Sequence, residues 1–112
     1  PKCGASWEGY AIEEVLRAVE PDEAYFWATH QGAEMDLLLR KHGRMYGVEC
    51  KRADAPGMTP SIRIALSDLA LKRVAVVYPG PQRYPMAEKV EAVPLSCIPQ
   101  GMAGLFPADA GR

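Results

Sequence analysis

Asp36, Glu49 and Lys51 are the residues whose types and spacing suggest chemistry in this sequence. A hard divalent cation such as Mg²⁺ binds through one or two carboxylates and keeps water molecules that can face a phosphate. A nearby lysine can stabilise the charge that develops at a reacting phosphate and help to orient an attacking water molecule. If the fold brings both carboxylates together, the set predicts hydrolysis of a phosphate ester with Mg²⁺ or Mn²⁺.

A predicted hairpin brings the two carboxylates together. Strand-like sequence lies on both sides of His42-Gly43, where the glycine supplies the positive φ that a tight turn requires. Counting back from this turn places Asp36 opposite Glu49, and then Glu34 opposite Lys51. Directly opposed side chains have Cβ atoms about 5 Å apart, so two like charges there need something that offsets their repulsion. A bound cation would do so.

Strand alternation assigns each side chain to one face of this hairpin. One face of the first strand is expected to hold Glu34, Asp36, Leu38 and Arg40, and the other Met35, Leu37 and Leu39. In the second strand Glu49 and Lys51 share a face. Cys50 points the opposite way, and we interpret it as a small core residue rather than a nucleophile. The ordinary alternative is a charged, solvated face that binds no metal.

Glu8 is a third acidic candidate. Helical periodicity predicts a first helix over residues 6–20, with Ser6 as its N-cap and Pro21 marking its end. At about 100° per residue, Glu8 falls near the middle of the apolar face, where we expect it to be partly desolvated and to face the other acids. The alternative is that Glu8 simply meets the positive end of the helix dipole.

The elements that position these residues are expected in the order helix, three strands, helix, strand. After the first helix come predicted strands around Tyr25, over 34–40 and over 44–52, a helix over 59–71, and a strand buried on both faces at 74–78. The strand–helix–strand order over 46–78 predicts a crossover to a parallel neighbour. We assign the aromatic side chains to the core rather than to a base-stacking platform: Trp7, Tyr25, Phe26 and Trp27.

Three further predictions concern the organisation of the chain. Residues 90–98 are expected to form an edge strand, because Pro94 is badly placed in a central one. Residues 1–100 are expected to form a single domain, and because the chain starts at Pro1 without an initiator methionine, we expect it to be a fragment of a longer polypeptide. Residues 101–112, rich in Gly, Ala and Pro, are expected to be a loosely ordered tail.

Composition narrows the function classes. The chain has 112 residues and a net charge of -1, which gives no global reason for tight binding to a polyanion. Nucleic acid would have to be met by a local basic rim, for which the candidates are Arg40, Lys41, Arg44, Lys51, Arg52, Lys72 and Arg73, although such residues are often only solvated. Three cysteines without C-x-x-C spacing indicate a reducing, cytoplasmic setting, and no apolar stretch is long enough for a membrane span.

The ordered set of Glu8 on a helix, Asp36 in a strand and Glu49-Cys50-Lys51 in the next strand resembles the PD-(D/E)xK nuclease superfamily. More narrowly, residues 4–9, 25–37 and 47–52 look like the C-terminal domain of prokaryotic AAA+ class ATPases, a domain catalogued as one of unknown function. The resemblance covers about residues 3–98. The chain departs from the older motif name in having Met35, rather than proline, before Asp36.

The resemblance implies Mg²⁺ ligands at Asp36, Glu49 and the main-chain carbonyl of Cys50, with Glu8 supporting the ion and Lys51 assisting the attacking water. It also implies an α/β fold with a restriction-endonuclease-like αβββαβ core, in which helices flank a central mixed sheet. We therefore expect a Mg²⁺-dependent nuclease-like domain attached to an ATPase module and acting on nucleic acid. The alternatives are a non-catalytic interaction domain of that ATPase, and nucleic-acid binding without cleavage.

Overall fold

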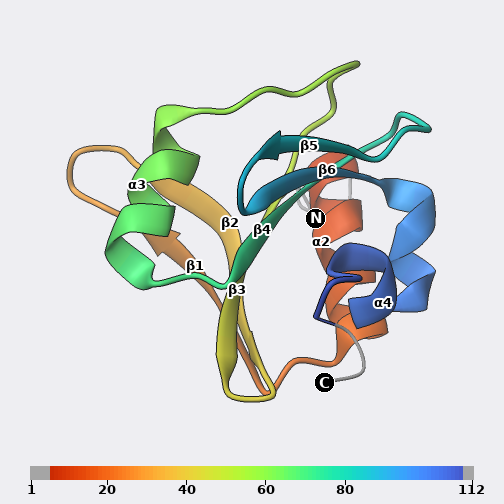
Figure 1. The fold of residues 1–112 in the computed structure, drawn as a ribbon, viewed down its shortest axis with the longest axis horizontal. Coiled ribbons are helices and arrows are strands. Elements are labelled where there is room, and N and C mark those ends of the chain that lie inside the picture. The colour runs from red at the N-terminus through yellow and green to blue at the C-terminus, as the bar shows by residue number, and fades with distance from the viewer. Residues whose placement is uncertain (1–5, 110–112) are drawn as a thin grey trace.

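Residues 6–109, the part of the chain that the computed structural model describes, fold around one six-stranded sheet. The strand order is β1-β2-β3-β4-β6-β5, and Figure 1 shows helices α2 and α3 on opposite sides of it. The elements are α2 (Trp7–Val19), β1 (Glu23–Ala28), β2 (Glu34–Lys41), β3 (Arg44–Cys50), α3 (Pro60–Leu69), β4 (Arg73–Tyr78), β5 (Tyr84–Ala87), β6 (Val90–Pro94), a 3₁₀ helix η1 (Leu95–Gln100) and α4 (Met102–Leu105). This arrangement confirms a mixed α/β fold.

Local sequence signals set both long helices as predicted. The side chain of Ser6 accepts a hydrogen bond from the N–H of Gly9 at the start of α2, and Thr59 accepts one from Ile62 at the start of α3. Each helix ends at a residue in the left-handed conformation, Glu20 for α2 and Ala70 for α3. Among residues 6–109, no helix is both long and apolar enough to cross a lipid bilayer.

The turn at His42-Gly43 fixes the central hairpin. Both of its residues have positive φ, 56° and 77°, as a two-residue turn of type I′ requires. Lys41 consequently pairs with Arg44, as predicted, and the ladder continues to Leu37 and Val48. Helix α3 then carries the chain over the sheet, and β4 pairs in parallel with β3. The prediction of a parallel neighbour is therefore confirmed.

Two apolar clusters, one on each face of the sheet, form the core. The α2-side cluster contains Ala11 and Val15 from the helix, alternate residues of β3 such as Val48, and residues after β6 such as Phe106. The α3-side cluster contains Ile62 and other α3 residues together with the opposite sheet positions. Strand β4 contributes side chains to both clusters, which explains its unbroken run of apolar residues.

The prediction of an edge strand at 90–98 is wrong. Strand β6 ends at Pro94 and lies between β4 and the true edge strand, β5. Pro94 is tolerated there because it occupies the last ladder position, opposite Tyr78. Sequence reasoning missed β5, a four-residue strand that contains Pro85.

The C-terminal segment is also more ordered than predicted. Residues 102–105 form α4, and Leu105 and Phe106 are buried in the α2-side cluster. The Phe106 ring lies 4.5 Å from that of Tyr46, measured between centroids. Gly and Ala in this segment permit close packing rather than disorder, because a Cβ at Gly104 would overlap the carbonyl of Cys97. Residues 110–112 of the predicted tail lie outside the described part of the chain.

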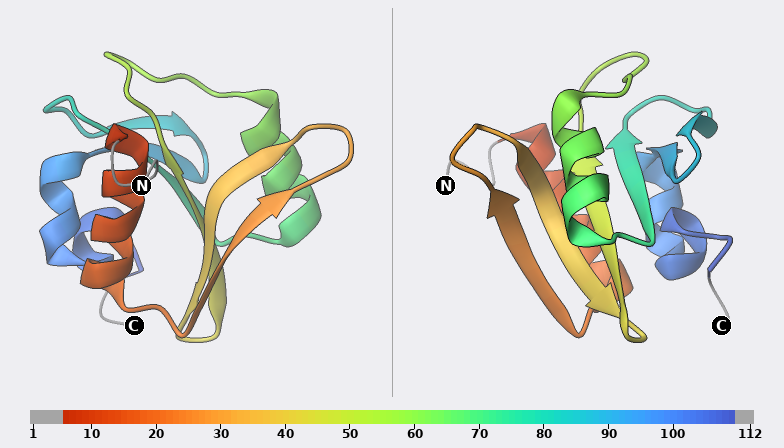
Figure 2. Two further views of the ribbon diagram at one scale, coloured as in Figure 1. Left: turned by 180° about the vertical axis from the view of Figure 1, so that it is seen from behind. Right: turned by 60° about the vertical axis from the view of Figure 1, so that its left-hand side comes forward.

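The predicted burial of the aromatic residues of β1 is wrong for two of them. Tyr25 keeps 41% and Phe26 61% of its surface exposed, while Trp27 packs against the α3-side cluster. Strand β1 is the outer strand of the sheet, paired only with β2, and Figure 2 shows it at the margin of the molecule. An edge strand has no neighbour to cover its outer side chains, which accounts for the difference.

Candidate functional site

The two acids are brought together where the β2-β3 ladder ends. The last regular pair is Leu37 with Val48, so the next positions are Asp36 and Glu49, as predicted. At these positions carboxylate oxygens, rather than backbone carbonyls, accept the hydrogen bonds of backbone N–H groups. The N–H of Asp36 donates to Oε1 of Glu49 over 2.9 Å, and the N–H of Cys50 donates to Oδ2 of Asp36 over 2.8 Å. Each carboxylate thus accepts a hydrogen bond from the backbone of the opposite strand, so the two residues interlock. We call this site, formed by Asp36 and Glu49 where the β2-β3 ladder ends, the fork.

A β-bulge in β2 places Asp36 in this position. On the β1 side, Leu38 pairs with Tyr25 but Met35 pairs with Trp27, so two residues of β2 oppose the single residue Phe26. The extra residue shifts the alternation of side chains, so that residues before the bulge point to the opposite sheet face from the one that strict alternation predicts.

The predicted alternation along β2 is wrong at this bulge. Met35 packs with Leu38 in the α3-side cluster, whereas Leu37 belongs to the α2-side cluster. Sequence alternation placed Met35 with Leu37, because a period of two contains no signal for an inserted residue.

Burial dominates the electrostatics of the pair. Desolvation raises the pKa of Asp36 above its ordinary value, against the lowering effect of the Cys50 N–H and of the Lys51 charge. Desolvation also raises the pKa of Glu49, which is only 7% exposed, and repulsion from Asp36 adds to this. Glu34 raises both pKa values further. Two partly desolvated carboxylates in one fork form a site in which a cation would be stabilised.

Lys51 lies beside Glu49, as the strand alternation predicts. Its Nζ is 3.8 Å from Oε2 of Glu49, and its side chain is 45% exposed. The Lys51 N–H donates to the carbonyl of Val77 over 2.8 Å, which holds the backbone against β4 just after β3 ends. The backbone of Lys51 is therefore held in place, while the ammonium group at the end of the side chain is accessible to solvent.

The predicted burial of Glu8 is wrong. Glu8 is exposed in the first turn of α2, and the buried positions of that helix begin only at Ala11. A helical wheel gives the angle of a side chain but not the part of the helix that overlaps the sheet. Glu8 still acts on the site, because its charge contributes to raising the pKa of Asp36.

Cys50 behaves as predicted for a core residue. It is 2% exposed and belongs to the α2-side cluster, and burial raises the pKa of its thiol. A neutral thiol is a poor nucleophile, so the side chain is structural. The N–H of Cys50 fixes the Asp36 carboxylate.

The donor set fits a hard cation through two residues. Asp36 and Glu49 present carboxylate oxygens in one fork, and Mg²⁺ needs only one or two carboxylates because it retains several waters. No group of three His, Cys, Asp or Glu side chains placed to hold a metal occurs within residues 6–109. Glu8 and the Cys50 carbonyl would therefore be additional contacts rather than members of a ready-made cage.

The predicted basic rim does not surround this fork. Only Lys51 and Arg52 follow the carboxylate end of β3, whereas the hairpin tip carries Lys41 and Arg44 at the other end of the strand. The remaining members, Arg40, Lys72 and Arg73, also lie toward the tip, since Met45 accepts a hydrogen bond from Lys72. Three of these basic side chains already have partners within the chain. Arg40 pairs with Glu23, Lys41 donates to the Glu20 carbonyl, and Arg73 pairs with Asp109.

Sequence reasoning missed the contact between β2 and α3 beside the fork. The N–H of Glu34 donates to Oγ of Ser61 over 3.1 Å, which ties the start of β2 to the first turn of α3. No sequence pattern indicates this contact, because the partners are 27 positions apart and the bond uses a backbone group of Glu34.

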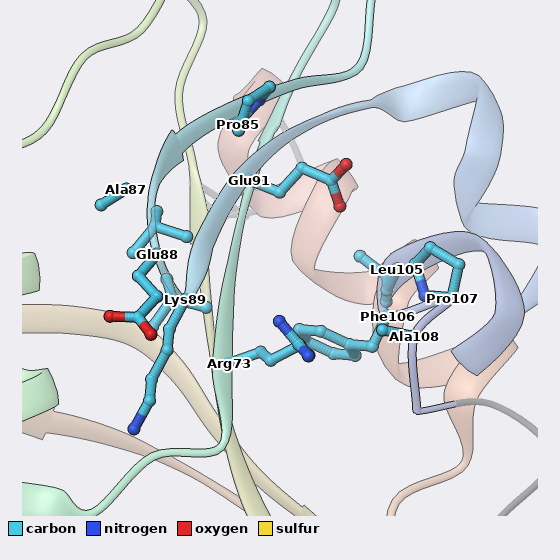
Figure 3. Close-up of a pocket in the computed structure, with 12 residues that line it drawn as sticks. Arg73, Pro85, Ala87, Glu88, Lys89, Glu91, Leu105, Phe106, Pro107 and Ala108 are labelled. Carbon is cyan, nitrogen blue, oxygen red and sulfur yellow. The ribbon is translucent and has the colours of Figure 1, made fainter.

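A cavity of about 280 Å³ lies away from the fork, between the β5-β6 hairpin and the C-terminal segment. Figure 3 shows Arg73 and Glu91 reaching toward Phe106 and Pro107 beside it. Arg73 pairs with Asp109 over 3.2 Å and Glu91 with Arg83 over 2.9 Å. The Arg73–Asp109 pair holds the C-terminal segment against the sheet, and Arg83, which also donates to the carbonyl of Gly104, ties the same segment to the β5-β6 hairpin.

A mixed sheet with helices on both faces and interlocked acids at a strand fork defines an α/β domain with a candidate cation site. The family model described as "Domain of unknown function (DUF4143)" matches residues 3–98, and the chain belongs to this family. It is 48% identical over 98 residues to the uncharacterized proteins Mb2031c of Mycobacterium bovis and Rv2008c of Mycobacterium tuberculosis. The alignment covers 88% of this chain and 22% of each relative, so the chain spans about a fifth of their length. No solved structure matches the chain.

Proposed function

We propose that this chain is a Mg²⁺-dependent, nuclease-like domain of the PD-(D/E)xK type that hydrolyses phosphodiester bonds in nucleic acid. The observation that carries the proposal is the fork. There the Glu49 carboxylate accepts from the N–H of Asp36 over 2.9 Å, the Asp36 carboxylate accepts from the N–H of Cys50 over 2.8 Å, and Lys51 Nζ lies 3.8 Å from Glu49 Oε2. These residue types, in this order along the chain, support the assignment to the motif. In the full-length protein we place the domain beside an AAA+ ATPase module, in the cytoplasm.

The order of elements supports a restriction-endonuclease-like core. The chain runs α2, β1, β2, β3, α3, β4, which is the αβββαβ order of that fold. The first three strands are antiparallel neighbours and the fourth is parallel to the third. The acids lie at the end of β3 and the start of β2, where the parallel and antiparallel parts of the sheet meet.

The residues of the fork have distinct proposed roles. Asp36 and Glu49 hold the ion, with the Cys50 carbonyl and Glu8 as supporting contacts. Bound Mg²⁺ supplies Lewis-acid activation of the phosphate and neutralises charge. Lys51 orients the attacking water and stabilises the negative charge that develops on the phosphate oxygens. Its 45% exposure leaves the ammonium group accessible to a substrate.

A second candidate is a non-catalytic interaction domain of the ATPase. It is favoured by the hydrogen bonds at the fork, because each carboxylate accepts a backbone N–H and so already has a structural role. The lack of a three-residue metal group within residues 6–109 points the same way.

Calorimetric titration of Mn²⁺ into the chain separates the two candidates. We expect the wild type to bind the ion, and Asp36→Asn and Glu49→Gln to lose binding, because an amide keeps the hydrogen bond but not the charge. Glu13→Gln, which alters an exposed acid of α2, is the matched control and should bind normally. A wild type that binds no Mn²⁺ would favour the interaction domain.

Cleavage is tested with the lysine. We expect Lys51→Met to bind Mn²⁺ as the wild type does but to lose hydrolysis of a labelled oligonucleotide, since the charge on Lys51 acts on the reaction rather than on the ion. Removal of one such electrostatic group typically costs about 10²–10³ in rate. Equal rates for wild type and Lys51→Met would remove Lys51 from the mechanism.

A further inference from the structure

Phe26 is the most exposed large apolar side chain among residues 6–109, at 61% of its surface. Its neighbour Trp27 packs into the α3-side cluster, and side chains alternate along a strand. The ring of Phe26 therefore stands on the α2 side of the sheet. A side chain this exposed contributes little to the core, so the ring of Phe26 is available to a ligand.

The position of Phe26 is set by the bulge that also positions Asp36. Tyr25 pairs with Leu38 and Trp27 with Met35, so Phe26 is the residue that opposes the bulged pair 36–37. Met35 and Leu38, which flank the bulged pair, belong to the α3-side cluster, and Phe26 faces away from that cluster. Leu37, within the pair, belongs to the α2-side cluster. The register thus places Phe26 across the ladder from Asp36 and Leu37, on the neighbouring strand.

Two basic residues near the fork suit a strand of nucleic acid. Lys51 is half exposed and Arg52 is exposed, and both follow the end of β3 at the fork. The outer edge of β1 has no neighbouring strand, so a ligand can approach Phe26 from outside the sheet. With the ring on β1, the proposed cation site at the start of β2 and the basic residues after β3, the base and the phosphate of a bound strand can be met by different parts of this surface.

We propose that Phe26 stacks on an unpaired nucleobase beside the phosphate held at the Asp36–Glu49 fork, so that the substrate is single-stranded or locally unpaired nucleic acid. This inference rests on the proposed function of the same site. Stacking on an aromatic side chain requires a base that has left the duplex stack, and it tolerates every base because each has a π face. Phe26 is then a residue that selects the structure of the substrate rather than its sequence.

The test is the affinity of the 112-residue chain for a labelled single-stranded oligonucleotide, measured by fluorescence anisotropy with Ca²⁺ as the ion. We expect Phe26→Ala to bind about tenfold more weakly, which is within the usual range for loss of one stacked base. Phe26→Tyr should restore binding to nearly the wild-type level. Ile64→Ala, which removes an exposed apolar side chain from α3, is the matched control and should leave affinity unchanged.

Two further measurements make the outcomes distinct. The melting temperature of Phe26→Ala should equal that of the wild type, because the side chain is mostly exposed. The matching duplex should bind more weakly than the single strand and should not respond to Phe26→Ala. Equal affinity of wild type and Phe26→Ala, equal affinity for duplex and single strand, or no binding of single strands at all would overturn the inference. Mn²⁺ binding that depends on Asp36 would leave the proposed metal site standing in each of those cases.

Discussion

Asp36 and Glu49 each have a structural and a chemical property in the same side chain. As acceptors for backbone N–H groups they close the fork where the ladder ends. As partly desolvated charges they repel each other and destabilise the folded chain at neutral pH, as their raised pKa values indicate. Conformational stability alone would be better served by neutral acceptors at these positions. A charge that costs stability here is what the proposed cation site would require.

Asp36→Asn should separate these two properties. The amide oxygen can still accept the N–H of Cys50, but the charge and its repulsion are gone, so we expect the melting temperature to rise. Asp36→Ala should instead lower stability, by about 1–3 kcal/mol relative to Asn, because the buried N–H of Cys50 loses its acceptor. Thermal unfolding in EDTA measures both. If Asp36→Asn is less stable than the wild type without metal, the charge itself stabilises the fold and this interpretation fails.

The pH dependence of stability follows from the same two groups. Because the pKa values of Asp36 and Glu49 are raised in the folded state, the folded chain holds protons there that the unfolded chain has released. Their contribution to stability is therefore largest at acidic pH and falls as pH rises through the interval between the ordinary carboxylate range and the raised values. Urea unfolding at several pH values should show the double variant Asp36→Asn/Glu49→Gln gaining on the wild type toward neutral pH. A difference that stays constant with pH would refute the shifts.

Among the elements, the hairpin was predictable and the bulge was not. The positive φ of His42-Gly43 fixes a two-residue turn, and a turn fixes a register, so the sequence correctly placed Asp36 opposite Glu49. The bulge opposite Phe26 leaves no trace in a pattern with a period of two. It arises from the pairing of β1 with β2, a tertiary contact. The sequence therefore predicts the two acids and their pairing, but not which face of the sheet the residues before the bulge occupy.

The turn carries a prediction of its own. Gly43→Ala should destabilise the chain by about 1–2 kcal/mol, because alanine disfavours a φ of 77° even though no atom lies within 4 Å of the added Cβ. Gly57→Ala is the matched control, since its Cβ also meets nothing within 4 Å and its φ is not positive. It should be neutral or slightly stabilising. Denaturant titration of both measures the difference, and equal stabilities would argue against the positive φ at residue 43.

For the molecule as a whole, the helices and the buried strand were readable from sequence because capping residues and apolar patterns are local. The order of the last strands was not readable from sequence, because β6 lies between β4 and β5 although it follows β5 in the chain. Pro94 is compatible with this inner strand only because it occupies the last position, opposite Tyr78. The C-terminal segment was misjudged for a related reason. Its small residues indicated disorder by composition, although Gly104 is needed for close contact with the carbonyl of Cys97.

The C-terminal segment should therefore be essential to the fold. Phe106 is 2% exposed and packs on Tyr46 within the α2-side cluster, so Phe106→Ala should cost about 3–5 kcal/mol, the usual effect of emptying a buried aromatic site. A chain that ends at Gln100 also loses Leu105 and the Arg73–Asp109 ion pair, and should be less stable still. A chain that ends at Asp109 keeps these contacts and is the control. Urea unfolding distinguishes them, because a chain ending at Gln100 that unfolds at the same urea concentration as the control would show that the α2-side core is complete without this segment.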